Sequence, residues 1–103
     1  MLKNKNITED HLDLMHVIQK DNKASQRQIA QQTGISIGKI NYCLKALIDI
    51  GFEKIENFNK SSQKLNYAYI LTPKGIKEKA AITKKFINYH KQEYDKLNSY
   101  MSK

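Results

Sequence analysis

Residues 26–45 read QRQIAQQTGISIGKINYCLK, and this stretch decides the fold of the chain. Ala30, Gly34 and Ile40 occupy its fifth, ninth and fifteenth places. A small residue at the fifth place lets a second helix cross closely, and glycine at the ninth suits a turn that needs a positive φ. A branched residue at the fifteenth place faces the partner helix. The pattern predicts a helix-turn-helix.

Capping residues mark where the two helices begin and end. Ser25 followed by Gln28 is a capping-box pattern for the first helix, and Ser36 is a good N-cap for the second. Gly51 follows Ile50 and suits the position just after a helix C-terminus. We therefore expect the helix-turn-helix over residues 25–50, with the second helix from Ser36 to Ile50.

One side of this second helix is apolar with a period of 3.6 residues, which predicts that it faces the core. The inward stripe consists of Ile29, Ile35, Ile40, Leu44 and Leu47. Cys43 lies beside this stripe, and we interpret it as a small core residue rather than a redox switch. It is the only cysteine, so no internal disulfide is expected.

The chain carries a formal net charge of +8, with 18 Lys and Arg against 10 Asp and Glu. Residues 1–50 hold 7 basic and 5 acidic residues, and residues 51–103 hold 11 and 5. Such an excess favours a polyanionic partner. No apolar run approaches the roughly 20 residues of a membrane span, and the first residues lack a signal-peptide core. We expect a small, soluble, cytoplasmic protein without a membrane partner.

Before the helix-turn-helix, Thr8 is placed to cap a helix that ends near Asp21 and acts as a scaffold. His11 and His16 are five residues apart, so they do not share a helix face, and neither has a partner at metal-ligand spacing. No metal site or cofactor is expected. Lys23 and Ala24 are expected to form a short strand.

After Gly51 the period changes from 3.6 toward 2, which predicts a β-hairpin over residues 52–71. A hairpin that directly follows a recognition helix makes the domain a winged helix. Its tip is polar and basic, and we expect it to touch DNA rather than to be an ordinary solvated turn. The tip residues assigned to DNA are Lys60, Ser61, Ser62 and Lys64.

Thr72 and Pro73 begin a helix that continues without Gly or Pro after Gly75 to about Tyr100. Apolar and soft polar residues follow a 4,3,4,3 spacing along it, which is typical of a coiled-coil seam. The seam consists of Ile76, Ala80, Thr83, Ile87, His90, Tyr94, Leu97 and Met101. A helix this long exceeds the body of the domain, so we expect a homodimer. Parallel, antiparallel and four-helix arrangements all remain open.

The chain is thus expected to be mainly α-helical with a small β-hairpin. Residues 1–72 would form a winged helix-turn-helix domain, and residues 73–103 would form one long dimerisation helix.

The run RQIAQQTGISIGKINYCLKALIDIGF (27–52), followed by a hairpin and by LTPKG (71–75), resembles the MarR-type winged-helix transcriptional regulators. The short form resembles a small branch associated with exopolysaccharide gene clusters. The resemblance implies a dimeric regulator of double-stranded DNA, acting on polysaccharide or capsule genes. Larger members carry further C-terminal helices that build a ligand pocket. A single long helix follows the wing here, which argues against a small-molecule effector.

The face of the second helix opposite the inward stripe is expected to enter the major groove. Asn41 offers a bidentate donor and acceptor to adenine, and Ile37 offers an apolar contact to a thymine methyl group. The remaining residues assigned to DNA on this helix are Ser36, Gly38, Lys39, Tyr42 and Lys45, joined at the start of the preceding helix by Gln26 and Arg27.

Two other classes of function are weaker. A protein–protein adaptor, with the long helix docked on a different chain, would carry an apolar rather than a polar and basic recognition face. An enzyme would need a Ser/His/Asp set, paired carboxylates, a glycine-rich phosphate loop or a metal cluster, and no such pattern occurs in the sequence.

Overall fold

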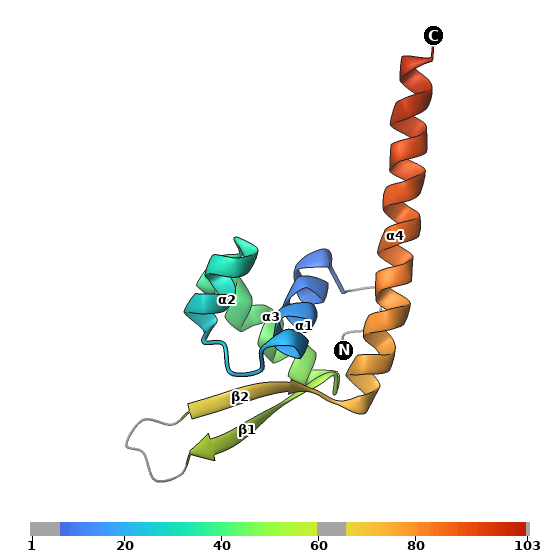
Figure 1. Cartoon of the computed structure of the whole chain (residues 1–103). Helices are drawn as coiled ribbons and strands as arrows, with labels where there is room; N and C mark the ends of the chain where they lie inside the picture. The colour runs from blue at the N-terminus through green and yellow to red at the C-terminus, as the bar shows by residue number, and fades with distance from the viewer. Residues whose placement is uncertain (1–6, 60–65, 103) are drawn as a thin grey trace.

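The computed structural model describes residues 7–59 and 66–102. Its elements are, in order, α1 (Glu9–Lys20), α2 (Gln26–Thr33), α3 (Ile37–Asp49), β1 (Glu53–Asn59), β2 (Asn66–Leu71) and α4 (Pro73–Met101). The three short helices gather above the base of the hairpin, and α4 stands beside them and extends far beyond them (Figure 1). This is the mainly helical winged helix-turn-helix, followed by one long helix, that the sequence predicts.

The core lies where α1, α2 and α3 meet the base of the hairpin. Leu14 and Ile40 are 0% exposed, and Phe52 is 2% exposed. Each fully buried aliphatic or aromatic side chain of this size contributes about 1.5–3 kcal/mol to folding. Cys43 is also 0% exposed within this cluster, which confirms that it is a core residue.

The helix-turn-helix begins and turns at the residues that its sequence indicates. Ser25 Oγ accepts from Gln28 N at 3.1 Å, and Gln28 Oε1 accepts in return from Ser25 N at 2.8 Å. Ser36 Oγ accepts from Lys39 N at 3.2 Å at the start of α3. Gly34 ends α2 with φ 76°, the left-handed conformation that glycine adopts without strain.

Helix α1 uses an unexpected partner for its cap. Thr8 is the N-cap, and its backbone N–H donates to Nδ1 of His11 at 3.1 Å. His11 thus closes the capping box that Glu or Gln usually closes. His11 is 4% exposed, and its Nε2 has no hydrogen-bond partner within the described part of the chain. Burial lowers the pKa of His11, so this imidazole is held in its neutral form.

The hairpin is antiparallel, with Glu53 opposite Leu71 and an irregularity in register between Asn57 and Asn59. The prediction of a short strand at Lys23 and Ala24 is wrong. Lys23 N donates to Asp21 Oδ1 at 3.1 Å, and Ala24 N donates to Asp21 O at 3.3 Å. The side chain and the backbone carbonyl of Asp21 therefore close a turn that draws these backbone groups away from strand pairing.

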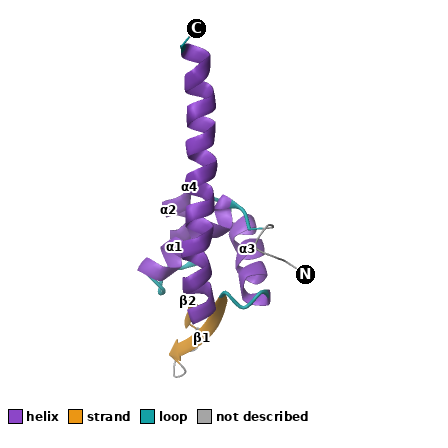
Figure 2. Ribbon diagram, turned by 90° about the vertical axis from the view of Figure 1, so that its right-hand side faces the viewer, coloured by secondary structure: helices purple, strands orange, loops and turns teal. Residues whose placement is uncertain are grey.

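Helix α4 is what makes the molecule elongated, with overall extents of 66 × 26 × 23 Å. Its first half packs on the body, since Ile82 is 3% exposed and Phe86 packs against the core. Beyond the contact that His90 makes with Glu9 of α1, the helix rises clear of the other elements in both views (Figures 1 and 2).

Candidate nucleic-acid interface

Helix α3 turns one side to the core and the other to solvent. Ile40, Leu44 and Leu47 are at most 1% exposed. On the opposite side Ile37 is 47% exposed and Tyr42 is 66% exposed. The further exposed side chains on this side are Ser36, Asn41 and Lys45. The outward surface, which we call the recognition face, offers apolar, hydrogen-bonding and cationic groups together, as base edges and phosphates require.

Gly38 lies at the first turn of this face. A Cβ at this position would meet no atom of the protein within 4 Å. The backbone there is not in the left-handed region either, since positive φ occurs only at Gly34 and Gly51 among the described residues. Nothing within the described protein therefore requires glycine at 38, and the open space beside it faces outward.

Lys39 points to the side of α3 rather than along the recognition face. Its Nζ lies 2.7 Å from Oδ2 of Asp10 at the start of α1. The hydrogen bond to Asp10 raises the pKa of Lys39 above its ordinary value. The sequence did not indicate this ion pair. To reach a phosphate, Lys39 would have to exchange or share this partner.

The start of α2 is joined to the wing. Gln26 Nε2 donates to Oη of Tyr69 on β2 at 3.4 Å, and this contact links positions 43 residues apart. Arg27, the next residue, is exposed. Gln26 is therefore a bridge between the helix-turn-helix and the hairpin, while Arg27 is free to approach a nucleic-acid backbone.

The tip of the wing, including Lys60, Ser61, Ser62 and Lys64, lies outside the described residues. At the base of the wing, Glu53 is 2% exposed, and neither of its carboxylate oxygens has a hydrogen-bond partner in the described structure. Burial raises the pKa of Glu53 from 4.5 to about 8, so the carboxyl is mostly protonated at neutral pH.

The burial of Glu53 was not predicted from the sequence. The imperfect alternation of residues 52–58 was the available signal, because Glu53 pairs with the buried Leu71 and shares its inward side. Glu53 also lies close enough to raise the pKa of Cys43 on α3, after the larger effects of burial and of Asp10.

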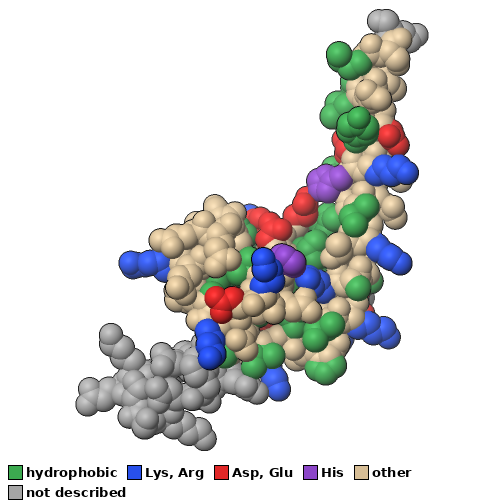
Figure 3. All heavy atoms as spheres, viewed as in Figure 1, with side chains coloured by type: hydrophobic (Ala, Val, Ile, Leu, Met, Phe, Trp, Pro, Cys, Tyr) green, Lys and Arg blue, Asp and Glu red, His purple; other side chains and the backbone are tan. Residues whose placement is uncertain are grey.

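The seam positions of α4 divide into two groups. Thr83 is half-buried against the body, and His90 Nε2 lies 2.8 Å from Oε1 of Glu9 on α1. Ala80 is exposed, and so are the apolar seam residues, with exposed fractions of 48% for Ile76, 60% for Ile87, 67% for Tyr94, 57% for Leu97 and 82% for Met101. Figure 3 shows apolar side chains along the protruding part of α4, on the side that faces the body lower down.

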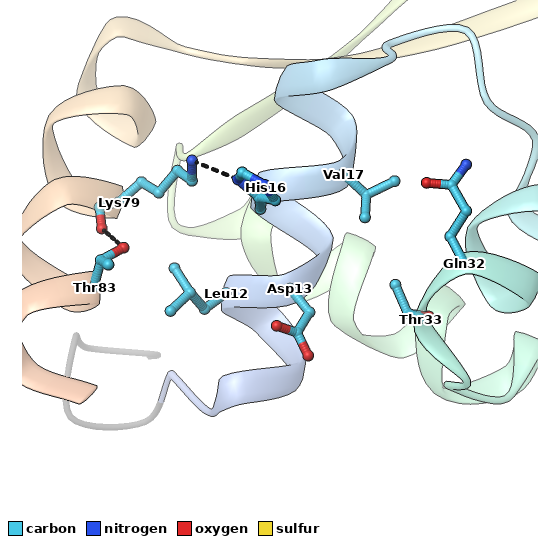
Figure 4. A pocket seen from close by; sticks show the side chains of 8 residues that line it. All are labelled: Leu12, Asp13, His16, Val17, Gln32, Thr33, Lys79 and Thr83. Carbon is cyan, nitrogen blue, oxygen red and sulfur yellow. Dashed lines mark hydrogen bonds between the residues drawn. The ribbon is translucent and has the colours of Figure 1, made fainter. Parts of the chain in front are cut away.

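A cavity of about 520 Å³ lies between α1, α2 and α4. Figure 4 shows Lys79 reaching from α4 to His16 of α1, where Nζ and Nδ1 are 3.0 Å apart. Burial, followed by the charges of Asp10 and Glu9, raises the pKa of Asp13 in its wall. The other lining residues are Leu12, Val17, Gln32, Thr33 and Thr83.

Within residues 7–59 and 66–102, no group of three or more His, Cys, Asp or Glu side chains is placed to hold a metal ion. No helix in the same ranges is long and apolar enough to cross a membrane.

Residues 11–52 match a protein family described as winged helix-turn-helix DNA-binding. This range begins in α1 and ends at the base of the wing, so it contains the whole recognition face. No curated protein matches the chain.

Several solved structures share the fold. A MarR/EmrR family transcriptional regulator from Acinetobacter sp. ADP1 superimposes with a TM-score of 0.66 and 18% identity, covering 86% of this chain and 61% of that one. Streptococcus pneumoniae FabT in complex with DNA gives 0.59 and 19%, covering 92% and 62%. Staphylococcus aureus MarR in complex with salicylate and kanamycin gives 0.65 and 22%, covering 89% and 60%.

The chain thus spans about three fifths of the length of these proteins. At such identities the likeness concerns the fold, and the family match concerns residues 11–52. Residues 11–52 therefore resemble a winged helix-turn-helix DNA-binding family, and the chain has the fold of the MarR-family transcriptional regulators.

Proposed function

We propose that this protein is a transcriptional regulator that binds specific sequences of double-stranded DNA as a homodimer. The observation that carries the proposal is the recognition face, which leaves Ile37, Asn41, Tyr42 and Lys45 exposed on a helix whose other side is fully buried. The family match over residues 11–52 and the DNA-bound state of FabT support it. The proposal assigns the chain no catalytic activity and places it in the cytoplasm.

On DNA, the recognition face would lie in the major groove. Asn41 would hydrogen-bond to adenine, and Ile37 would pack on a thymine methyl group. Ser36 and Lys45 would contact phosphates, and Tyr42 would reach either a base or the backbone. The absence of a side chain at Gly38 would let the backbone of α3 approach the groove.

Residues outside the recognition face would position the domain on DNA without recognising the base sequence. Arg27 is exposed at the start of α2, where that helix would cross the phosphate backbone. Lys60 and Lys64 would bring the tip of the wing to the adjacent backbone, together with Ser61 and Ser62. Lys39 would add a phosphate contact once it leaves Asp10, and Gln26 would hold the wing through Tyr69.

Dimerisation would use the protruding half of α4. Ile87, Tyr94 and Leu97 are each more than half exposed there, and isolated proteins rarely leave such a row of large apolar side chains uncovered. In this division residues 1–72 bind DNA and residues 73–103 join the two copies. The family resemblance further suggests exopolysaccharide or capsule genes as targets, which chromatin immunoprecipitation with sequencing of the bound DNA would test.

The adaptor function remains the second candidate, because the same exposed row, together with Tyr89 at 55% and Tyr100 at 61%, would also fit a different chain. The molecular mass of the purified protein by light scattering separates the two. A mass of twice the chain supports the homodimer, whereas a monomer that captures another protein through α4 supports the adaptor.

Selection of bound duplexes from a random DNA pool, at near-physiological salt, tests the function directly. We expect an inverted repeat with half-sites about one helical turn apart. Recovery of only salt-sensitive, sequence-blind binding would refute the proposal, because the net charge of +8 would then explain all of the affinity.

The role of Asn41 is tested with Asn41→Ala, using Asn88→Ala on the exposed surface of α4 as the matched control. Loss of a bidentate contact should cost about 1–3 kcal/mol on the selected site and relax the preference at one base pair. Equal losses on the selected and scrambled duplexes would contradict a reading role for Asn41.

A further inference from the structure

The end of the recognition helix and the start of α4 meet in space, although the hairpin separates them in sequence. After α3, Gly51 has φ 83°, and Phe52 N donates back to Leu47 O at 2.9 Å. Phe52 O in turn accepts from Thr72 N at 3.0 Å. We call this meeting point, residues 50–52 with residues 72–75, the joint.

The Thr72 side chain ties the two helices together at the joint. Its Oγ1 donates to Gly51 O at 2.6 Å and accepts from Gly75 N at 3.0 Å. One hydroxyl thus caps α4 and anchors it to Gly51, just beyond the C-cap of α3. Lys74 Nζ adds a hydrogen bond to Ile50 O at 3.4 Å and lies 5.7 Å from the centroid of the Phe52 ring.

Gly75 sets how closely the helix approaches. A Cβ at this position would lie 2.1 Å from Phe52 O and 2.9 Å from Phe52 C, both of them backbone atoms that cannot swing away. The φ of Gly75 is not positive, so the contact rather than the backbone conformation requires glycine. The first turn of α4 therefore rests directly on the backbone just beyond the recognition helix.

A second level of contacts, farther along α4, fixes the direction of the helix. Ile82 is buried in the core, and Lys79 Nζ lies 2.7 Å from Gln19 Oε1 and 3.0 Å from His16 Nδ1 on α1. A helix held at both its first turn and its third is a stiff lever on the DNA-binding body. A change at the joint that tilts the whole helix on the body would displace the protruding half.

We infer that the joint sets the number of base pairs between the two half-sites that the protein binds best. This inference rests on the proposed homodimer. If two copies join through the second half of α4, the angle between body and helix places each recognition helix along the DNA. Thr72 and Gly75 are then positioning residues that act on spacing without touching DNA.

Because α4 is long, the spacing between the half-sites is sensitive to the angle between the body and the helix. From Gly75 to Leu97 the helix extends about 33 Å at 1.5 Å per residue, so a tilt of about 10° displaces the body by about 6 Å. That displacement is nearly two base-pair steps of about 3.4 Å along the duplex. Small changes at the joint should therefore alter the preferred spacing, because each dimer binds half-sites at a fixed separation.

The test uses the full-length protein, the half-site selected by the wild type, and duplexes whose two half-sites are separated in steps of one base pair. A duplex with a single half-site measures the affinity for the half-site sequence without any contribution from the spacing. Thr72→Val keeps the side-chain shape but removes both hydrogen bonds, Thr72→Ser retains them, and Ser99→Ala removes a hydroxyl that donates only within α4. Circular dichroism melting confirms that each variant is folded.

We expect Thr72→Val to flatten the spacing preference, with the affinity ratio between the best separation and its neighbours falling at least about threefold. Thr72→Ser and Ser99→Ala should behave as the wild type, and single-half-site affinity should stay within about twofold in all of them. Gly75→Ala should move the optimum by one base pair or more. Thr72→Val carries the test if Gly75→Ala does not fold.

An unchanged spacing ratio in Thr72→Val, or a loss that is equal on the single half-site and on every separation, would overturn the inference. The joint would then serve stability alone. A wild-type protein that binds without any spacing preference would instead refute the homodimer of the proposed function, and the inference with it. The wild-type measurement therefore distinguishes the two failures.

Discussion

Replacing Glu53 by glutamine should stabilise this protein at neutral pH. Glu53 is 2% exposed at the base of the wing, and both carboxylate oxygens lack a partner within the described residues. Glutamine has nearly the same shape but does not ionise. Glu53→Gln therefore isolates the free-energy cost of burying the charge from the cost of burying a polar group.

The direction and size of this change in stability follow from the pKa of Glu53. Burial raises the pKa of Glu53 from 4.5 in the ordinary carboxyl to about 8 in the fold. The folded state therefore binds more protons than the unfolded chain between these values, so the free energy of unfolding falls as pH rises through this window. Each pH unit corresponds to about 1.4 kcal/mol, so at pH 7 the wild type has lost about 3 kcal/mol relative to pH 4.5.

The assay is urea unfolding of Glu53→Gln and wild type, followed by circular dichroism at several pH values from 4.5 to 8. The two free energies of unfolding should be similar at pH 4.5, and the variant should exceed the wild type by about 3 kcal/mol at pH 7. In thermal unfolding at pH 7 this difference corresponds to a rise in Tm of more than about 10 °C. Glu93→Gln on α4 is the matched control, and no change is expected from it.

Parallel pH curves for Glu53→Gln and wild type would refute this reasoning. Such a result would mean that the folded carboxyl titrates near 4.5, so that solvent or a counter-charge reaches it. A variant that is less stable than wild type at every pH would mean that the carboxylate has a favourable partner. Either result would mean that the charge of Glu53 is compensated in the folded protein.

Three further predictions concern the turn at Gly34, the first turn of α3 and the proposed dimerisation helix. Gly34→Ala should lower the free energy of unfolding by about 1 kcal/mol because φ is 76° there. Gly38→Ala should raise it by about 0.5–1 kcal/mol because the position is open and helical. Urea unfolding measures both changes, and equal effects of the two substitutions would contradict the assigned backbone conformations. Leu97→Glu should place like charges in the proposed dimer interface and raise the dissociation constant at least tenfold, corresponding to about 1.4 kcal/mol. Asn98→Glu, which is one residue off the seam, should change it less than threefold in analytical ultracentrifugation, and equal weakening by both would remove Leu97 from the interface.

Much of the helix-turn-helix could be predicted from the sequence because its signals are local. The caps at Ser25 and Ser36 and the turn at Gly34 each depend on residues three or four apart, and all are present in the structure. The inward placement of Ile40 and Leu44 follows from helical period alone. The start of α4 at Thr72 and Pro73 belongs to the same class.

The candidate site was predictable in its outline but not in its contacts. The helical period indicates that Asn41 and Tyr42 face away from the core. It does not indicate that Lys39 pairs with Asp10, 29 positions earlier in the chain, or that Gln26 reaches Tyr69. Such contacts depend on how separate elements pack, and surface ion pairs of this kind add too little energy to leave a signature in the sequence.

The sequence was sufficient to predict the helices, the hairpin, the caps at Ser25, Ser36 and Thr72, the outward face of α3 and the length of α4, because period and capping act within a few turns of one helix. The tertiary structure was needed to show what covers each position. It placed Ile82 in the core, left Leu97 exposed on the same helix, buried Glu53 without a partner, and seated Gly75 on the backbone of Phe52. A seam of regular spacing runs through all of α4, but the body of the domain is shorter than that helix. The length of the body along α4 therefore sets where packing within the chain ends and where the exposed apolar row, which we propose binds a second copy, begins.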